Sequence, residues 1–230
     1  MSLDISTKYD TEGSLATATK IKIAETFKIG ISSKDVVASY NDWSTSFEAI
    51  IEQGIYTAPV IALKEVLGHV SPESRAATTV LDVGAGTGWL GARLHEEGFR
   101  HIHALEPSEG MRSKLRKKGV YTREFPVPLG TGKCSIPSDT YDVVISSGSF
   151  DEGHIPVNGL DELVRVTKKG GLVVIVMLLK KLNPTEPFTG KLEPHMEELE
   201  RKGAWIKLQR RVFPNFVFEK EGVLFTFHVV

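Results

Sequence analysis

The 230-residue sequence predicts an α/β fold with a doubly wound, mostly parallel, seven-stranded sheet, a C-terminal antiparallel hairpin and an N-terminal helical lid. Three observations support this fold class. From residue 78 onward, short apolar runs alternate with amphipathic stretches that end at glycine, which is typical of repeated strand–helix units. The C-terminal segment instead holds two long strand-like runs with no helix between them. Residues 1–70 show helical periodicity, so we separate this segment from a single globular domain at 71–230.

The N-terminal segment is expected to be mostly helical. One amphipathic helix is indicated by apolar residues that recur every four positions, at Ile23, Phe27 and Ile31. A second helical stretch is expected from Ser33 to Leu67 with a break near Pro59, because proline disrupts a helix interior. Together these helices would form a lid over the domain that follows.

The domain at 71–230 is expected to alternate strands with helices. The strands are expected at 78–83, 101–106, 120–125, 141–146 and 172–179. The helices are expected at 87–98, 108–119, 158–171 and 193–203, each running up to a glycine that suits a helix end. Short links between them imply parallel strands with right-handed crossovers. The runs at 204–213 and 222–230 are expected to form the antiparallel hairpin.

A glycine-rich turn, Gly84–Gly88, follows the first predicted strand. In a doubly wound sheet, ligands bind at the carboxyl ends of the strands, at the switch point beside the first strand. Glycines there permit positive φ and let a ligand approach the backbone closely. Two ligand classes fit this turn, because "GTGWLG" (86–91) also matches the G-x-G-x-x-G pattern of dinucleotide sites.

Two acids near this turn bear on the choice. Glu106 ends the second strand and can accept hydrogen bonds from a ribose diol, which both cofactor classes contain. Asp82 ends the first strand beside the turn, where a carboxylate would repel a pyrophosphate. S-adenosylmethionine carries a sulfonium and an ammonium group and no phosphate, so Asp82 favours it over a nicotinamide dinucleotide. The hairpin supports the same choice, because dinucleotide folds usually close with a sixth parallel strand.

Several segments resemble, in order, the successive motifs of class I S-adenosylmethionine-dependent methyltransferases. They are "VLDVGAGTG", "ALEPSEGM", "YDVVISSGSF" and "LDELVRVTKKGGLVVIV". The resemblance covers about residues 40–179 and implies a Rossmann-like fold, which the end hairpin matches. The segments "SYNDWS", "LEPSEGM" and "SSGSFDEGHIP" resemble, more narrowly, the Williams–Beuren-region methyltransferase-like family.

The resemblance implies a cofactor-binding set that divides by the part of S-adenosylmethionine contacted. The methionine and ribose part would contact Asp82, Gly84, Ala85, Gly86 and Gly88, and the ribose hydroxyls would bind Glu106. The adenine would contact Pro107, Met111 and Leu129, the sulfonium would lie over Ser146 and Ser147, and the lid would contribute Tyr40 and Trp43. Many relatives carry an Asp or Asn after the third strand for the adenine amino group. Here "FPVPLGTG" replaces it, so the adenine would be held through the backbone.

The loop "SSGSFDEGHIP" (146–156) follows the fourth strand, where the methyl acceptor must arrive. Asp151 and His154 are the candidate catalytic residues, because either can act as a general base for an oxygen or nitrogen acceptor. Enzymes that methylate nucleic-acid bases often carry an Asn/Asp-Pro-Pro-aromatic motif here to hold a flipped base. The motif is absent, so we expect a small-molecule or protein acceptor rather than nucleic acid.

Three functions follow from these patterns. The first is an S-adenosylmethionine-dependent methyltransferase that transfers a methyl group by in-line displacement. The second is a non-catalytic module that binds S-adenosylmethionine or its demethylated product, which the lack of an identifiable acceptor motif leaves open. The third is an NAD(P)-dependent oxidoreductase that uses "GTGWLG".

Composition and charge bear on the binding partners and the cellular compartment of the protein. The formal net charge is −1, which argues against a protein whose main task is to grip phosphates. Cys134 is the only cysteine, which fits a reducing compartment, and no secretory signal or membrane-length apolar run is evident, so we expect a cytoplasmic protein without membrane contact. His101 and His103 share a strand face but have no third ligand, so no metal site is expected. The oligomeric state is not indicated.

Overall fold

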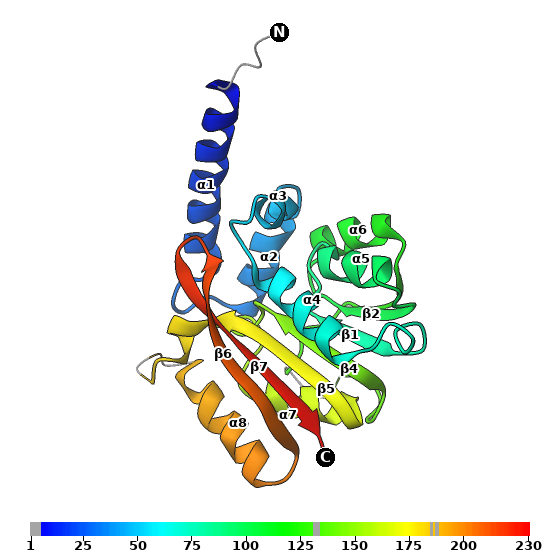
Figure 1. Cartoon of the computed structure of the whole chain (residues 1–230). Coiled ribbons are helices and arrows are strands. Elements are labelled where there is room, and N and C mark those ends of the chain that lie inside the picture. The colour runs from blue at the N-terminus through cyan, green and yellow to red at the C-terminus, as the bar shows by residue number, and fades with distance from the viewer. Residues whose placement is uncertain (1–5, 131–133, 185, 187–188) are drawn as a thin grey trace.

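The computed structural model describes residues 6–130, 134–184, 186 and 189–230. A seven-stranded sheet forms its centre, with the order β3-β2-β1-β4-β5-β7-β6 (Figure 1). The strands are β1 (Thr79–Val83), β2 (His101–Leu105), β3 (Tyr121–Phe125), β4 (Tyr141–Ser147), β5 (Thr167–Leu178), β6 (Trp205–Val217) and β7 (Lys220–Val229). The first five are parallel, and β7 lies antiparallel between β5 and β6. The predicted sheet and its C-terminal hairpin are therefore confirmed.

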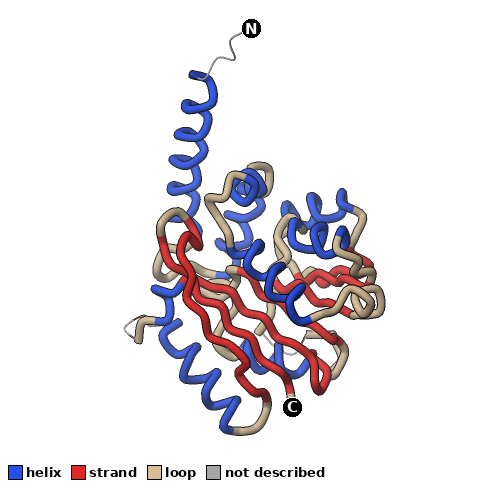
Figure 2. Tube along the Cα trace, viewed as in Figure 1, coloured by secondary structure: helices blue, strands red, loops and turns tan. Residues whose placement is uncertain are grey.

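Helices cover both faces of this sheet, giving three layers (Figure 2). They are α1 (Ser6–Thr26), α2 (Ser33–Trp43), α3 (Phe47–Glu52), α4 (Ala58–His69), α5 (Trp89–Glu96), α6 (Glu109–Lys118), α7 (Gly159–Val166) and α8 (Leu192–Arg201). Two short 3₁₀ helices, η1 (Leu179–Leu182) and η2 (Thr189–Lys191), connect β5 to α8. The long helix α1 projects from the body, and only its C-terminal part lies against other elements (Figure 1).

Alternation along the strands divides the apolar core between the two faces. Val80 and Ile102 point toward α4 and α5, whereas their neighbours Leu81 and Val83 point toward α7 and α8. Successive side chains of a strand point to opposite faces, so a buried parallel strand must be apolar on both. Each fully buried aliphatic side chain stabilises the fold by about 1.5–3 kcal/mol relative to an exposed one. The runs of Val, Ile and Leu thus form two cores, one for each helical layer.

Two helix predictions need correction. The stretch predicted from Ser33 to Leu67 is divided into α2, α3 and α4, and Pro59 lies in the first turn of α4, where proline is well tolerated. The helix predicted at 158–171 ends at Val166, because Thr167–Gly171 already belongs to β5. Thr167 pairs with Tyr141 of β4, and the register shifts before Val143. Pairing with a neighbouring strand, which sequence periodicity cannot show, overrides the helical pattern there.

The ends of α1 and α6 can be compared with the helix ends expected from the sequence. Helix α1 ends at Thr26, so Ile23 lies within it, whereas Phe27 and Ile31 follow it. The predicted glycine end of α6 is confirmed, because Gly119 adopts φ of 66° at the C-cap. At the other end of α6, Ser108 Oγ accepts a hydrogen bond from the Met111 N–H. No helix in the described part of the chain is long and apolar enough to cross a membrane.

Gly91, which completes the dinucleotide-like pattern, has a packing role. It lies within α5, and a Cβ atom there would overlap the ring and hydroxyl of Tyr121 from β3. Its backbone N–H donates to the Tyr121 Oη over 3.1 Å. The same Tyr121 hydroxyl donates to Asp82 Oδ2 over 2.7 Å. Gly91 therefore lets α5 approach the sheet closely enough for this chain of hydrogen bonds to form.

Replacing Gly91 with alanine is expected to lower the free energy of unfolding by about 1–3 kcal/mol, because the added methyl group overpacks the contact with Tyr121. Gly68→Ala provides the matched control: Gly68 is also helical, but it has open space around its Cβ position. There the alanine should stabilise the helix by about 0.5–1 kcal/mol. Urea unfolding of both variants measures the effect, and equal changes would contradict the packing role.

Candidate cofactor and acceptor site

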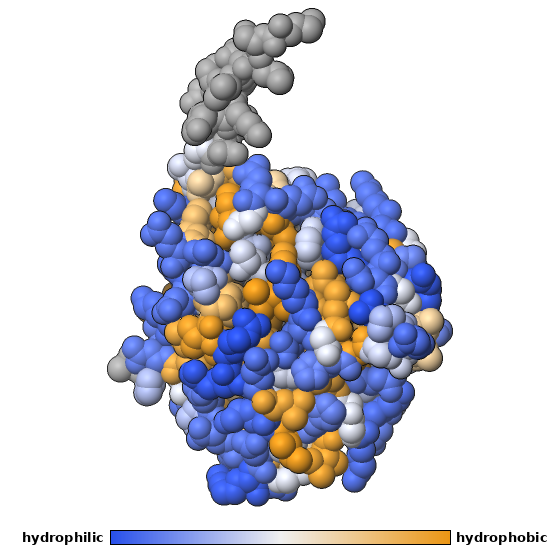
Figure 3. All heavy atoms as spheres, viewed as in Figure 1, coloured by the Kyte–Doolittle hydropathy of each residue, from blue (hydrophilic) through white to orange (hydrophobic). Residues whose placement is uncertain are grey.

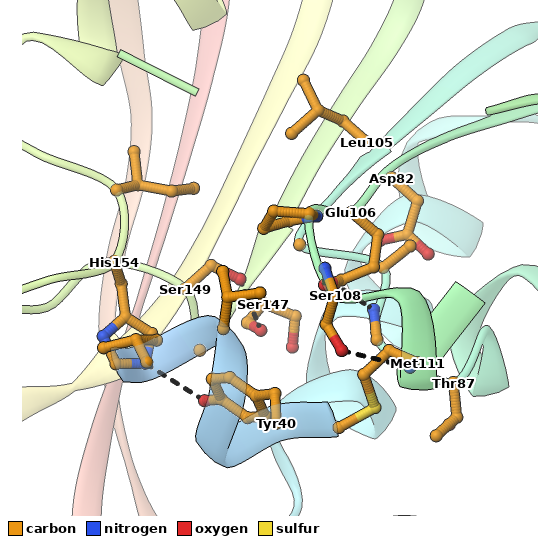
Figure 4. A pocket seen from close by; sticks show the side chains of 18 of the residues that line it. Tyr40, Asp82, Thr87, Leu105, Glu106, Ser108, Met111, Ser147, Ser149 and His154 are labelled. Atoms are coloured by element: carbon orange, nitrogen blue, oxygen red, sulfur yellow. Dashed lines mark hydrogen bonds between the residues drawn. The ribbon is translucent and has the colours of Figure 1, made fainter. Parts of the chain in front are cut away.

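A cavity of about 340 Å³ opens at the carboxyl ends of β1, β2 and β4. The loops after these strands form its base, and α2 and α3, which belong to the N-terminal segment of the chain, close it. In Figure 4, Asp82 and Glu106 lie toward one end of this cavity and His154 toward the other, with Ser147 and Ser149 between them. The sheet therefore brings together acids and a histidine from three separate segments of the chain.

The Glu106 carboxylate is held by two backbone N–H groups. Its Oε2 accepts from Gly86 over 2.9 Å, and its Oε1 accepts from Ser108 over 2.8 Å. The residue is 6% exposed, and burial raises the pKa of this carboxyl while the two N–H donors oppose the shift. The carboxylate is thus fixed at the cavity wall, where its remaining lone pairs can accept hydrogen bonds from a ligand.

Asp82 occupies the end of β1 and is 2% exposed. Burial raises its pKa to about 7, and the nearby Glu106 adds to this rise, while the hydrogen bond from Tyr121 lowers it. Burial and the adjacent Asp82 raise the pKa of Tyr121, so its hydroxyl remains a donor. The cavity therefore contains a carboxyl group that a cationic ligand would ionise.

The glycine turn has the backbone conformation predicted for it. Gly84, Gly86 and Gly88 have φ of 73°, 56° and 80°, in the left-handed region that favours glycine. A Cβ atom on Gly84 would overlap the Ser149 side chain, whereas the Cβ position of Gly86 is open. The turn thus exposes backbone to the cavity at Gly86 and packs closely at its two ends.

Helix α2 is attached to α6, near the Glu106 end of the cavity, by Asn41. Its Oδ1 accepts from the Ser108 hydroxyl over 2.7 Å and from the Gly110 N–H over 2.8 Å. A Cβ atom on Gly110 would overlap the Asn41 backbone, so this glycine permits the close approach of α2 to α6. This contact places Tyr40 over the cavity.

Tyr40 and His154 form a hydrogen-bonded pair at the end of the cavity away from Asp82. His154 Nδ1 lies 2.9 Å from the Glu152 carbonyl oxygen, so Nδ1 carries the proton and donates. Nε2 is then the acceptor of the Tyr40 hydroxyl, 3.2 Å away (Figure 4). Burial lowers the pKa of His154 and raises the pKa of Tyr40. The pair is therefore a neutral imidazole with a phenol donating to it.

Asp151 is engaged elsewhere. It is 5% exposed, and its Oδ1 pairs with Lys181 Nζ at 2.9 Å and accepts from the Glu152 N–H at 2.7 Å. It lines a neighbouring cavity rather than the one that contains Glu106. Of the two candidate catalytic residues, only His154 faces the first cavity.

This neighbouring cavity has a volume of about 920 Å³. It lies between the C-terminal part of α1, the end of β5 and the β6–β7 hairpin. Four residues line both cavities: Tyr40, Phe47, Tyr56 and Gly148. The two cavities therefore meet at these residues.

Most of the predicted cofactor-binding residues line the first cavity: Tyr40, Asp82, Gly84, Ala85, Gly86, Glu106, Pro107, Met111, Leu129 and Ser147. Three do not. Trp43 lines the second cavity, Gly88 caps α5 and packs against Tyr121 and Leu115, and Ser146 is fully buried in β4. The sequence reasoning did not single out Asn41, Tyr56 or Tyr121, whose roles depend on contacts across long sequence separations. The quoted segment "SYNDWS" contained the one available signal, for Asn41.

Polar groups without partners also line the first cavity. Ser147 Oγ and Trp89 Nε1 are buried and have no hydrogen-bond partner among the described residues. An unsatisfied buried polar atom costs about 1–3 kcal/mol, so such atoms commonly await a ligand or water. Together with Glu106 and Asp82, they fit a ligand that has hydroxyl groups and a positive charge.

The comparisons with known proteins agree with this geometry. Residues 81–175 match the family described as a methyltransferase domain. The human Methyltransferase-like protein 27 is 31% identical over 166 residues, which cover 72% of this chain and 66% of that protein. The chain belongs to the class I S-adenosylmethionine-dependent methyltransferases. Membership of this family favours S-adenosylmethionine over a nicotinamide dinucleotide as the ligand of the glycine turn.

Two further relatives show the breadth of the similarity. The tRNA U34 carboxymethyltransferase of Shewanella piezotolerans is 32% identical over 120 residues, 50% of this chain and 36% of that protein. The crystal structure of a SAM-dependent methyltransferase from Aquifex aeolicus superposes with a TM-score of 0.57 at 19% identity, covering 83% of this chain and 98% of that one. The chain thus spans about two thirds or less of the length of these curated relatives. The Aquifex structure shares its fold.

Proposed function

We propose that this chain transfers a methyl group from S-adenosylmethionine to a small-molecule acceptor. The observation that carries the proposal is the Glu106 carboxylate, held by Gly86 and Ser108 at the cavity wall beside Asp82. A carboxylate in this place suits a ribose diol, and a second buried carboxyl suits a cationic centre. The Asp82 carboxyl would not suit a pyrophosphate.

Different residues of the chain would contact different parts of the cofactor. Glu106 would accept from the ribose hydroxyls, and Asp82 would face the charged methionine part. Pro107, Met111 and Leu129 would pack against the adenine. Ser147 would face the sulfonium, and Tyr40 would cover the ligand from α2. These assignments follow the family resemblance and the shared lining of one cavity.

When bound, S-adenosylmethionine supplies a methyl group on a positively charged sulfur, which is already activated for in-line displacement. The chain then has to align the acceptor and exclude water. Alignment of the reacting groups can lower the activation free energy by about 7–11 kcal/mol. The aromatic residues that close the cavity, Tyr40, Phe47 and Tyr56, are placed to perform this task.

The second cavity supports a small-molecule acceptor. It adjoins the first at Tyr40, Phe47, Tyr56 and Gly148, and its volume of about 920 Å³ is typical of sites for drug-sized ligands. One group of relatives is named for tRNA, but this chain covers only 36% of their length. The single cysteine, Cys134, also supports our proposal of a cytoplasmic location.

The decisive experiment has two stages. Calorimetry should first detect binding of S-adenosylmethionine and of its demethylated product to the intact chain. Labelled methyl transfer should then be measured in a cell extract separated into small-molecule, protein and RNA fractions, with label expected in the first. No cofactor binding would refute the proposal, and binding without transfer to any fraction would identify a non-catalytic binding module instead.

We also propose that the segment at 1–70 acts as a lid, since α2 contributes Tyr40 to the cavity. Addition of the demethylated cofactor is expected to slow amide hydrogen exchange in α2 by about tenfold or more, because the bound ligand would restrain the helix. Helix α8, on the opposite side of the sheet, is the internal control. Equal exchange in α2 with and without cofactor would contradict the lid.

A further inference from the structure

We propose that the methyl acceptor is a flat aromatic molecule with a hydroxyl group, and that its proton passes through Tyr40 to His154. This inference rests on the proposed function and adds the acceptor class and the proton path. It is carried by two independent observations: the composition of the second cavity and the direction of the Tyr40–His154 hydrogen bond.

The second cavity, called here the aromatic chamber, is rich in rings, which belong to eight of its 22 lining residues. They are Phe27, Tyr40, Trp43, Phe47, Tyr56, Phe150, Phe216 and Phe218. Other apolar side chains, such as Ile23 and Met177, also line the chamber. Figure 3 shows apolar side chains just below the projecting end of α1, as one of several apolar patches on this face. Aromatic side chains prefer offset-stacked or edge-to-face contacts with other rings, so a flat ring is the ligand that this lining would recognise.

The charges of the aromatic chamber do not suit a polyanion. The buried carboxylate of Asp151 is already paired with Lys181, so this pair neutralises itself. Lys20 lies over the Phe218 ring, 5.2 Å from its centroid. Glu186 and Glu219 also line the chamber, as do Lys180 and Lys220. Recognition of nucleic acid depends on cations that contact successive phosphates, and here three acids that would repel phosphates lie among four lysines.

The acceptor atom is identified by the Tyr40–His154 pair. The Tyr40 hydroxyl donates to His154 Nε2, so the lone pairs of its oxygen are free of that bond and can accept a proton from a ligand. Tyr40 lines both cavities, whereas His154 lines only the first. A hydroxyl group that reaches from the aromatic chamber toward the cofactor would therefore meet the Tyr40 oxygen at the junction.

The proposed step balances as follows. The acceptor hydroxyl gives its proton to the Tyr40 oxygen while Tyr40 gives its own proton to His154 Nε2. The acceptor oxygen forms a bond to the methyl carbon, and the carbon–sulfur bond breaks with its electron pair going to sulfur. The products are a methyl ether, the neutral thioether and a proton on His154, which is later lost to water.

A phenol is favoured over an amine as acceptor for a chemical reason. A phenol has a pKa near that of tyrosine, about 10, so it is a poor nucleophile until it loses its proton. Exchange of a proton between two phenols costs little, which suits Tyr40 as the intermediate carrier. A neutral amine attacks with its own lone pair and would not need this relay before methyl transfer.

The first test measures binding in the chamber, with 1-naphthol as the probe and the full chain saturated with demethylated cofactor. Ala24 is exposed on α1 and lines the chamber, so Ala24→Trp should fill part of it and weaken naphthol binding at least tenfold. Ala18→Trp is the matched control, since Ala18 is exposed on the same helix outside both cavities. Both variants should retain cofactor affinity. Absence of naphthol binding, or equal loss in both variants, would overturn the assignment of the chamber.

The second test addresses the relay, using methylation of 1-naphthol and of the more acidic 4-nitro-1-naphthol. Tyr40→Phe and His154→Gln should slow methylation of 1-naphthol by about 10²–10⁴-fold. They should slow the nitro compound far less, because that phenol is already ionised near neutral pH. The residual rate with 1-naphthol should rise with pH as the phenolate forms in solution. Equal slowing of both naphthols would show a structural role and overturn the relay.

Outcomes for the acceptor class are separate from those for cofactor binding. Calorimetry with demethylated cofactor tests the proposed function by itself, and it is unaffected by the choice of acceptor. If the cofactor binds but 1-naphthol binds without forming a methyl ether, the hydroxyl assignment is wrong. Methylation of bulk tRNA or of a tyrosine-containing peptide, with no methylation of either naphthol, would replace the proposed acceptor with that macromolecule.

Discussion

Glu106→Gln is expected to weaken binding of S-adenosylmethionine and of its demethylated product by about 100-fold. Hydrogen bonds to a charged group are worth about 1.5–3 kcal/mol, and the ribose diol offers two hydroxyl groups to this carboxylate. The amide would also turn an NH₂ group toward a backbone N–H, because Gly86 and Ser108 each donate to one carboxylate oxygen. Isothermal titration calorimetry measures both affinities.

The control for this prediction is Glu197→Gln, an exposed acid on α8 outside both cavities. It removes the same charge from the chain and should leave cofactor affinity unchanged. Because Glu106 also stabilises the turn, thermal unfolding of Glu106→Gln should be recorded alongside. A folded Glu106→Gln variant with unaltered affinity would refute the placement of the ribose.

Asp82→Asn is expected to abolish a pH dependence of S-adenosylmethionine binding. Burial raises the pKa of Asp82 to about 7, so in the cofactor-free protein the carboxyl is mostly protonated at pH 6 and mostly ionised at pH 8. A cationic ligand prefers the ionised form, so affinity should rise about tenfold between these pH values and then level off. In the Asp82→Asn variant the affinity should be flat across this range and lower than that of the wild type at pH 8.

The raised pKa of Asp82 also makes the stability of the cofactor-free protein depend on pH. An acid whose pKa is raised on folding favours the fold while it is protonated. Its contribution is therefore complete below its ordinary pKa of 3.8 and is lost as the pH rises toward 7. Cofactor-free wild type should lose stability relative to Asp82→Asn across this window. Urea unfolding at several pH values measures the difference, and parallel profiles would contradict the raised pKa.

Two neighbours of Asp82 bear on these measurements. Glu106 raises the pKa of Asp82 by its charge, and the Tyr121 hydroxyl lowers it by donating a hydrogen bond. Tyr121→Phe should therefore move the midpoint of the binding profile to higher pH. This variant keeps the ring that packs against Gly91 and Gly88, so it separates the hydrogen bond from the packing.

The comparison of His154 with Asp151 shows where sequence reasoning about the site stopped. Both are titratable residues of one loop, three positions apart, and the sequence offers no ground for preferring either. The fold separates them: Asp151 turns toward Lys181 of η1, whereas His154 turns toward Tyr40 of α2. Those partners are distant in sequence, so the pairing depends on how the loop packs between two elements.

The sequence by itself determined the strand–helix alternation, the hairpin, and the acids Asp82 and Glu106 beside a glycine turn. These features depend on local periodicity and on residues that follow a strand end directly, and both are visible in the linear order. Only the tertiary structure decided that α7 stops at Val166, that Trp43 lines the second cavity, and that Tyr121 bonds to Asp82. Each of these depends on contacts between segments far apart in the chain, whose packing outweighs local preference.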